Sequence, residues 1–271
     1  MIVGSMLTAA PANAEIKNYD GVGEYIMSDF ETPDVAKQRA KLYAERNAQE
    51  KAGVYLKSYS RTENFELVDD EIVAMTSGIL KILNVDYKTL PIEHGGIMYR
   101  ATILASIDTD KVDEWISKGV AERESLVEKN LELQRRLDEQ EKLIAELKIK
   151  AEKSKNPSAD EKLKQEFAEA DKIFMSNIKL EEGNRLVLLN ADWSYKMAVD
   201  AWSEAIELNP LNALAYEARG YYYLYYTEDY AESFNDYNQA VKLRPNVADN
   251  YYYRGLCRLN LGDIDKAKKD F

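Results

Sequence analysis

The sequence predicts a multidomain protein with an α+β N-terminal domain, a coiled-coil or long-helix linker and an all-α array of helical repeats. Pro210 and Pro245 lie 35 residues apart and each closes an apolar helix, a spacing typical of stacked helical hairpins. The residues from Glu122 to Ala151 contain no Gly or Pro and have a helical pattern. The residues from Glu15 to about Trp115 combine strand and helix patterns. The expected parts are a leader at 1–14, the α+β domain at 15–116, the linker at 117–155 and the array at 156–271.

The leader has the features of the late half of a secretory signal peptide. An apolar stretch from Ile2 to Ala10 is followed by an Ala-x-Ala sequence that ends at Ala14, directly before polar residues. It is shorter than the roughly 20 apolar residues of a transmembrane helix, and so is every later apolar run. We expect export to the periplasm or cell envelope; a flexible apolar N-terminus is the alternative. No charge precedes Glu15 and the last hairpin stops at Phe271, so we expect the natural chain to continue beyond both ends.

The α+β domain is predicted from alternating strand and helix patterns. The expected elements are a strand at 23–27, a helix from Pro33 to Gly53, a strand at 54–60, a short helix at 69–75 and two antiparallel strands at 82–90 and 97–107. Gly95 and Gly96 are expected to supply positive φ angles between the last two strands. The Gly-x-Gly-x-Tyr strand and the Ala-rich helix with Arg39-Ala40 and Arg46-Asn47-Ala48 resemble small modules of bacterial envelope lipoproteins and flagellar-assembly-type periplasmic proteins. That resemblance implies only an envelope setting.

The linker from Glu122 to Ala151 carries a spacing of four and three residues between core positions over about four heptads. The expected oligomer interface is Leu126, Asn130, Leu133, Leu137, Ile144 and Leu147, with Gln140 and Ala151 completing the stripe. Asn130 at a core position favours a parallel homodimer, in which Arg136 and Glu141 would pair between chains. The alternative is a single solvated helix that acts as a spacer.

The C-terminal third resembles the tetratricopeptide repeat (TPR) family, in which each unit is a hairpin of two helices. In the last unit the likeness is carried by Tyr251, Arg254-Gly255, Leu259, Leu261-Gly262-Asp263, Ala267 and Phe271. In the middle unit it is carried by Tyr216, Gly220, Tyr223, Tyr230, Ser233, Tyr237, Ala240 and Pro245. A fainter first unit has Gly183, Leu186, Ala198, Trp202, Ala205 and Pro210.

The resemblance implies that the first helices of the hairpins line a concave, partner-binding face. The candidate contacts are Leu214, Glu217, Tyr221, Leu224, Tyr225, Asp249, Tyr252 and Leu256. The family's clamp for a C-terminal carboxylate uses Lys, Arg and Asn on these helices, whereas this chain has Ala218 and Tyr253 at Asn-type positions. A partner with apolar or basic extended segments therefore fits better.

Other classes of function are disfavoured by composition. The net charge of −12 opposes nucleic acid binding. Gly21-Val-Gly23 lacks the third glycine of a dinucleotide site and is interpreted as a backbone turn. His94 has no second ligand for zinc, Asp108 is interpreted as a helix cap, and the single Cys257 as a buried apolar residue. We expect no catalytic, cofactor or metal site.

The sequence thus predicts an exported, non-enzymatic scaffold that binds a protein or peptide partner in the cell envelope. One alternative is a structural subunit of an envelope assembly that oligomerises through the linker. Another is a TPR scaffold of the cytoplasm.

Overall fold

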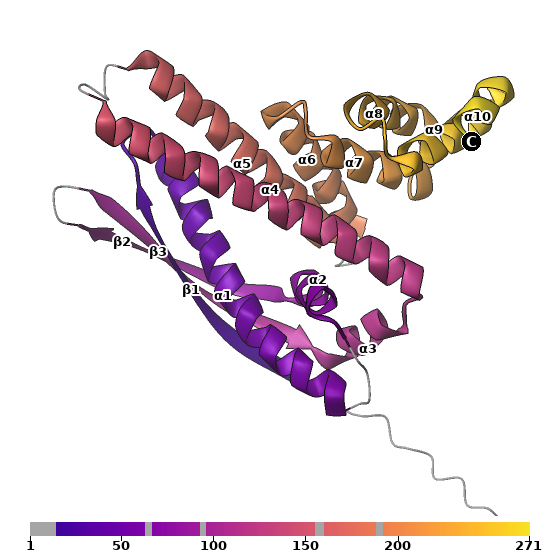
Figure 1. Ribbon diagram of the computed structural model, residues 1–271. Coiled ribbons are helices and arrows are strands. Elements are labelled where there is room, and N and C mark those ends of the chain that lie inside the picture. The colour runs from indigo at the N-terminus through magenta and orange to yellow at the C-terminus, as the bar shows by residue number, and fades with distance from the viewer. Residues whose placement is uncertain (1–14, 63–66, 93–95, 155–159, 188–191) are drawn as a thin grey trace, which may run out of the picture. The chain divides into compact units, whose positions relative to one another are not determined.

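The computed structural model divides the chain into two compact units (Figure 1). It describes residues 15–62, 67–92, 96–154, 160–187 and 192–271. The first unit comprises Met1–Ile26 and Arg39–Leu131, and the second comprises Met27–Gln38 and Glu132–Phe271. Strand β1 (Ile16–Met27), helix α1 (Pro33–Thr62) and helix α4 (Val120–Lys153) therefore each have residues in both units.

The first unit is built on a three-stranded sheet. Its strand order is β1-β3-β2, with β3 at Ile97–Asp108 and β2 at Lys81–Pro91. Strands β2 and β3 are antiparallel, with Val85 opposite Ile103, which confirms the predicted pair of strands. Strands β1 and β3 also run in opposite directions, because Thr109 N donates to Glu15 O at one end and Arg100 pairs with Glu24 farther along.

Helix α1 lies across one face of this sheet (Figure 1) and is longer than predicted. The prediction of a helix end at Gly53 and a strand at 54–60 is wrong. A row of fully buried side chains four residues apart continues through the expected boundary: Ala40, Ala44, Ala48, Ala52 and Leu56. This helical period outweighs the strand propensity of the local Val and Tyr residues.

Two glycines of β1 allow α1 to approach the sheet closely. Gly21 and Gly23 lie inside the strand, so their interpretation as a turn is wrong. A Cβ on Gly21 would lie 2.9 Å from Ile103 Cγ1, and one on Gly23 would lie 2.7 Å from the carbonyl carbon of Tyr43. The Gly-x-Gly pattern thus serves helix–strand packing rather than chain reversal.

Two short helices complete the first unit. Helix α2 spans Asp69–Ile79, and α3 spans Thr109–Ser117. Asp108 caps α3 by accepting a 3.0 Å hydrogen bond from Asp110 N, which confirms its predicted role. In the described residues positive φ angles occur only at Glu228 and Gly262, so the expected positive φ at Gly96 is wrong. Gly95 and His94 lie outside the described residues.

In the second unit, the part of α4 after residue 131 pairs with helix α5 (Glu161–Val187). Ile144 and Leu147 of α4 form a buried cluster with Leu163, Phe167 and Ala170 of α5, and Phe30 and Ala151 pack against it. The carboxyl half of the predicted heptad stripe is thus filled by residues of the same chain. The structure places this segment inside a compact unit rather than as a separate linker.

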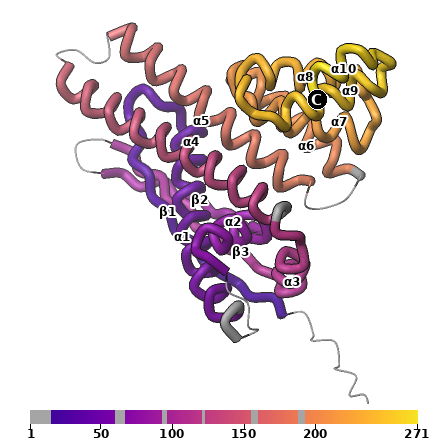
Figure 2. Tube along the Cα trace, turned by 45° about the vertical axis from the view of Figure 1, so that its right-hand side comes forward, coloured from indigo at the N-terminus to yellow at the C-terminus, as the bar shows by residue number. Residues whose placement is uncertain are grey.

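The remaining helices follow α5 as a series of hairpins (Figure 2). They are α6 (Asp192–Leu208), α7 (Ala213–Tyr225), α8 (Tyr230–Leu243), α9 (Ala248–Asn260) and α10 (Ile264–Asp270). Three hairpins result in the described part of the chain: α5–α6, α7–α8 and α9–α10.

Candidate functional site

In each of these hairpins a glycine of the first helix packs against an aromatic ring that lies in the second helix or directly follows it. The pairs are Gly183 with Trp202, Gly220 with Tyr237, and Gly255 with Phe271. A Cβ on the glycines would lie 2.6 Å from Trp202 Cδ1, 3.2 Å from Tyr237 Cδ2 and 2.7 Å from Phe271 Cε1. These distances are shorter than optimal carbon–carbon contact, so glycine allows the close helix approach.

The middle and last hairpins also share a bidentate ion pair next to the glycine. Arg219 donates to both carboxylate oxygens of Asp236 at 2.7 and 2.9 Å. Arg254 does the same to Asp270 at 2.5 and 3.0 Å. Both carboxylates are only 3% exposed. Burial raises the pKa of Asp236, and the hydrogen bonds from Arg219 counteract that rise.

Each of these arginines also links its hairpin to the preceding one. Arg219 Nη1 donates to Ser203 Oγ of α6 at 2.8 Å, and Arg254 Nη1 donates to Asn238 Oδ1 of α8 at 3.3 Å. The guanidinium groups are therefore fully engaged in holding the array together.

A buried polar network takes the corresponding role between α5 and α7. Asn212 is fully buried and donates to Ser176 Oγ and Asn177 Oδ1 at 2.9 and 3.3 Å. Its own carbonyl accepts a hydrogen bond from Arg136 of α4 at 3.0 Å. The α4 helix is thus tied to the start of the middle hairpin, and the polar atoms of Asn212 are satisfied.

A connected group of aromatic rings extends over the first helices of the middle and last hairpins. We call Tyr221, Tyr225, Tyr252 and Tyr253 the tyrosine surface. Tyr221 and Tyr225 lie 4.7 Å apart between ring centroids, and both meet Tyr253 of the next hairpin at nearly right angles. Tyr252 touches Tyr253 at 5.4 Å. The exposed fractions of Tyr221, Tyr225 and Tyr252 are 42%, 50% and 50%, so large ring areas face solvent.

Two phenols of this surface have raised pKa values. Burial, and then the neighbouring Tyr221, Tyr225 and Asp249, raise the pKa of Tyr253 to about 12. Burial also raises the pKa of Tyr225. The surface therefore offers apolar ring faces together with hydroxyl groups that donate and accept hydrogen bonds.

Comparison with known proteins identifies the repeats. No protein-family model matches the chain. Serine/threonine-protein phosphatase 5 of Homo sapiens is 36% identical over 77 residues, and the match falls in its TPR region. The heat shock protein sti1 homolog of Schizosaccharomyces pombe is 31% identical over 77 residues. Over part of its length, this chain is a TPR protein.

These likenesses are limited in extent. The matched segments are 28% of this chain but only 15% of the phosphatase and 13% of the sti1 homolog. Among solved structures, the second TPR of Spaghetti (RPAP3) bound to HSP90 peptide SRMEEVD has 27% identity and a TM-score of 0.36, over 39% of this chain and 93% of that one.

The TPR structure places the predicted contact residues in different environments. Tyr221, Tyr225, Tyr252 and Asp249 are exposed, and Leu214 is half-buried. The other predicted contacts are Leu224, Leu256 and Glu217, and they serve the array itself.

Leu224 is 5% exposed in a cluster with Tyr237, Ala240 and Cys257, which puts it out of reach of a partner. Leu256 is half-buried against the same cluster. Glu217 accepts hydrogen bonds from Arg244 at 3.0 and 3.1 Å and from Asn250 at 2.9 Å. Its carboxylate is therefore an internal link of the TPR array.

Sequence reasoning missed the central member of the tyrosine surface. Tyr253 stacks on the buried Tyr237 at 5.1 Å and contacts Tyr221, Tyr225 and Tyr252. Tyr253 stands at a position where the family's carboxylate clamp has an Asn-type residue, and this difference was a signal that the surface is aromatic at that point. The arginine–aspartate pairs were also missed, although in the middle and last hairpins Arg precedes the glycine and Asp precedes the aromatic ring.

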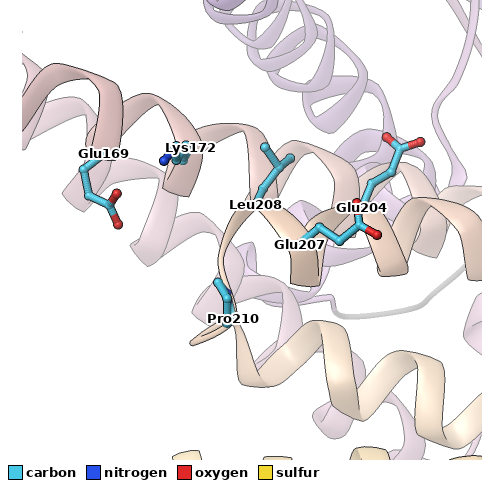
Figure 3. A pocket seen from close by; sticks show the side chains of 6 residues that line it. All are labelled: Glu169, Lys172, Glu204, Glu207, Leu208 and Pro210. Atoms are coloured by element: carbon cyan, nitrogen blue, oxygen red, sulfur yellow. The ribbon is translucent and has the colours of Figure 1, made fainter. Parts of the chain in front are cut away.

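An open pocket on the first hairpin is a weaker candidate (Figure 3). Its lining consists of Glu169 and Lys172 of α5 with Glu204, Glu207, Leu208 and Pro210 at the end of α6. Glu204 is already paired with Lys179 at 2.8 Å. The four charged residues of this lining are all exposed to solvent, so the pocket is formed mainly by solvated charges.

Other reactive groups do not form a site in the described part of the chain. No cluster of three His, Cys, Asp or Glu side chains is arranged to hold a metal there. Cys257 is buried 3.1 Å from Ser233 Oγ, and burial raises the pKa of its thiol. Among the described helices, none has the length and apolar character to span a bilayer.

Proposed function

We propose that this protein is a non-enzymatic scaffold whose TPR hairpins bind an extended segment of a protein partner at the tyrosine surface. The observation that carries the proposal is the continuous set of half-exposed rings across two consecutive hairpins. Tyrosine offers a large rigid contact area at low entropic cost, and it is enriched among residues that dominate binding energy.

A double variant, Tyr221→Ala with Tyr252→Ala, tests this function. We expect at least about a tenfold loss of partner retention, because truncating a central tyrosine commonly costs more than 1 kcal/mol. The matched control is Tyr226→Ala, since Tyr226 is 52% exposed but packs with Tyr195 and Tyr222. Retention is measured by cross-linking and mass spectrometry of bound proteins. Equal retention by the double variant and the control would refute the proposal.

We further propose that the protein works in the cell envelope after export. The support is the apolar stretch and Ala-x-Ala sequence of residues 1–14. A cytoplasmic TPR scaffold is the competing proposal. Mass spectrometry of the N-terminus of the protein from its source cells decides between them, since export predicts a mature chain that begins at Glu15. An uncleaved chain in the soluble cytoplasmic fraction would rule the export proposal out.

The parallel homodimer through α4 also stays a proposal. Leu126 is 37% exposed, whereas Leu133, Leu137, Ile144 and Leu147 are buried within one chain. A dimer would thus have to use the amino half of the stripe or rearrange the rest. Light scattering of residues 15–271 gives the test: a monomer across a wide concentration range excludes the dimer and the structural-subunit alternative that depends on it.

A further inference from the structure

The cations on the two helices that carry the tyrosine surface are paired with carboxylates of other helices. Arg219 is the one cationic residue of α7, and Arg254 and Arg258 are those of α9. Arg219 holds Asp236, while Arg254 and Arg258 both hold Asp270 at 2.5 and 2.7 Å. Releasing Arg219 to meet a ligand would leave the buried carboxylate of Asp236 unpaired, which is costly. Arg254 and Arg258 share the buried carboxylate of Asp270, so either would have to give up an ion pair to meet a ligand. An acidic ligand therefore finds no unpaired cation on these two helices.

One carboxylate remains available beside the rings. Asp249 is exposed and lies one helical turn before Tyr252 and Tyr253, so it shares their face of α9. No ion pair of Asp249 occurs in the part of the chain that the structure describes. Its charge contributes to the raised pKa of Tyr253, after burial and the two neighbouring tyrosines, so its field reaches the centre of the surface. The surface is thus electronegative as well as aromatic.

The ring faces are also accessible to a cation. The exposed tyrosines meet their neighbours at interplanar angles of 44° for Tyr221 with Tyr225, 88° for Tyr225 with Tyr253 and 68° for Tyr252 with Tyr253. Tyr252 also meets Phe271 at 54°. None of these contacts is a parallel stack, and Tyr221, Tyr225 and Tyr252 keep 42–50% of their surface exposed. An exposed ring face attracts an ammonium or guanidinium group through the ring quadrupole.

We infer that the segment bound at the tyrosine surface carries an arginine or lysine flanked by apolar residues, and not an acidic or carboxylate-terminated sequence. This inference rests on the proposed peptide-binding function. The cation lies over the ring of Tyr225 or Tyr252 with Asp249 as its counter-charge, and the flanking apolar groups cover the remaining ring area.

Three fluorescein-labelled probes test the inference by anisotropy: GLRLRLG, its uncharged analogue GLQLQLG and the acidic peptide SRMEEVD. We expect the arginine probe to bind the full chain at least roughly fivefold more tightly than either of the others, which corresponds to one cation–π contact. The preference should shrink in the double variant Tyr225→Leu with Tyr252→Leu and in Asp249→Asn. The charge control is Glu232→Gln, which removes an exposed carboxylate from α8 and should keep the preference.

Each contrary outcome has a distinct meaning. Tighter binding of SRMEEVD overturns the inference but leaves peptide binding intact, and so does equal binding of GLRLRLG and GLQLQLG. An arginine preference that survives both the Tyr225→Leu/Tyr252→Leu double variant and Asp249→Asn would come from the overall negative charge, and it overturns the inference as well. If no probe binds, the inference fails, and the partner-retention experiment decides the proposed function independently.

Discussion

The first and middle hairpins solve the same packing problem with different polar contacts. Both place a glycine against an aromatic ring, Gly183 on Trp202 and Gly220 on Tyr237. Beside these contacts the middle hairpin buries the Arg219–Asp236 pair, whereas the first has Glu182 and Ala201 at the corresponding positions. Its charges stay at the surface, where Lys179 bridges Glu182 and Glu204 at 3.0 and 2.8 Å.

The difference indicates which contacts define a hairpin. The close glycine–aromatic contact is common to both and sets the helix separation. The ion pair is present in the middle and last hairpins and absent from the first, so it is not needed to form a hairpin. In the hairpins that have it, the buried carboxylate requires its arginine, because an unpaired buried charge is costly. Three sets of substitutions, in order of expected effect, test this view.

Asp236→Ala should have the largest effect. It leaves Arg219 without its partner in a mostly buried position, and we expect a loss of about 3 kcal/mol in the free energy of unfolding. The measurement is urea unfolding followed by circular dichroism. Glu204→Ala is the matched change in the first hairpin, and it should cost less than about 1 kcal/mol because the Glu204 side chain is 53% exposed.

The double variant Arg219→Leu with Asp236→Leu sharpens this prediction. If the arginine only compensates for the buried carboxylate and the pair adds no net stability, removing both charges should recover most of the unfolding free energy that Asp236→Ala loses. A double variant as unstable as Asp236→Ala alone would show that the ion pair itself stabilises the middle hairpin. The first hairpin, which lacks the pair, would then not be a valid guide to what the middle one needs.

Gly220→Ala should have the next largest effect. The new Cβ would lie 3.1 Å from Asp236 Cβ and 3.2 Å from a Tyr237 ring that is 1% exposed and has no room to move. We expect a loss of about 1–2 kcal/mol by urea unfolding. Gly255→Ala should cost less, because its neighbour Phe271 is 62% exposed. Gly78→Ala in α2 meets no atom within 4 Å and should be neutral or stabilising. A similar loss at all three glycines would contradict the packing argument.

The turns between paired helices give the smallest effect. Glu228 has φ of 54° in the turn of the middle hairpin, and Gly262 has φ of 84° in that of the last. Glu228→Gly should raise the free energy of unfolding by about 0.5–1 kcal/mol, because glycine adopts positive φ without steric cost. The change is measured as a small rise in the midpoint temperature of thermal unfolding. Gly262→Ala should lower stability by about 1 kcal/mol. The two variants should change stability in opposite directions. A loss of stability in Glu228→Gly would mean that the contacts of the Glu228 side chain outweigh the steric cost of its backbone conformation.

The sequence predicts the repeats well because their determinants are local. Gly220, Tyr237 and their equivalents recur at a fixed period, and each pair is satisfied within one hairpin. The Ile97–Asp108 strand and its partner are predictable for the same reason, since their alternation is strong and their loop is short.

The sequence is wrong, or leaves the answer open, where a pattern has two structural solutions. A heptad stripe through Ile144 and Leu147 requires a neighbouring helix, but its period does not specify whether that helix belongs to a second copy or to the same chain. The Val54–Ser60 segment suits a strand by propensity, and only tertiary burial of Ala52 and Leu56 decides for a helix. Tyr253 and Tyr252 are adjacent tyrosines, and their different exposure depends on the buried Tyr237 beneath one of them.

The short segment before α1 has a consequence for how the repeat unit forms. Phe30 stacks on Phe167 at 5.0 Å, and Lys148 reaches the fully buried carboxylate of Glu31, so a piece of early chain completes the core around α4 and α5. Phe30 and Phe167 are 137 positions apart in sequence, whereas the hairpins join neighbours. Closing so long a loop costs entropy before any contact offsets it. Synthesis on the ribosome proceeds from the amino terminus, so Phe30 is made long before the α4–α5 residues that it packs against. The core of the α4–α5 pair therefore stays incomplete until the segment around Phe30 packs onto it.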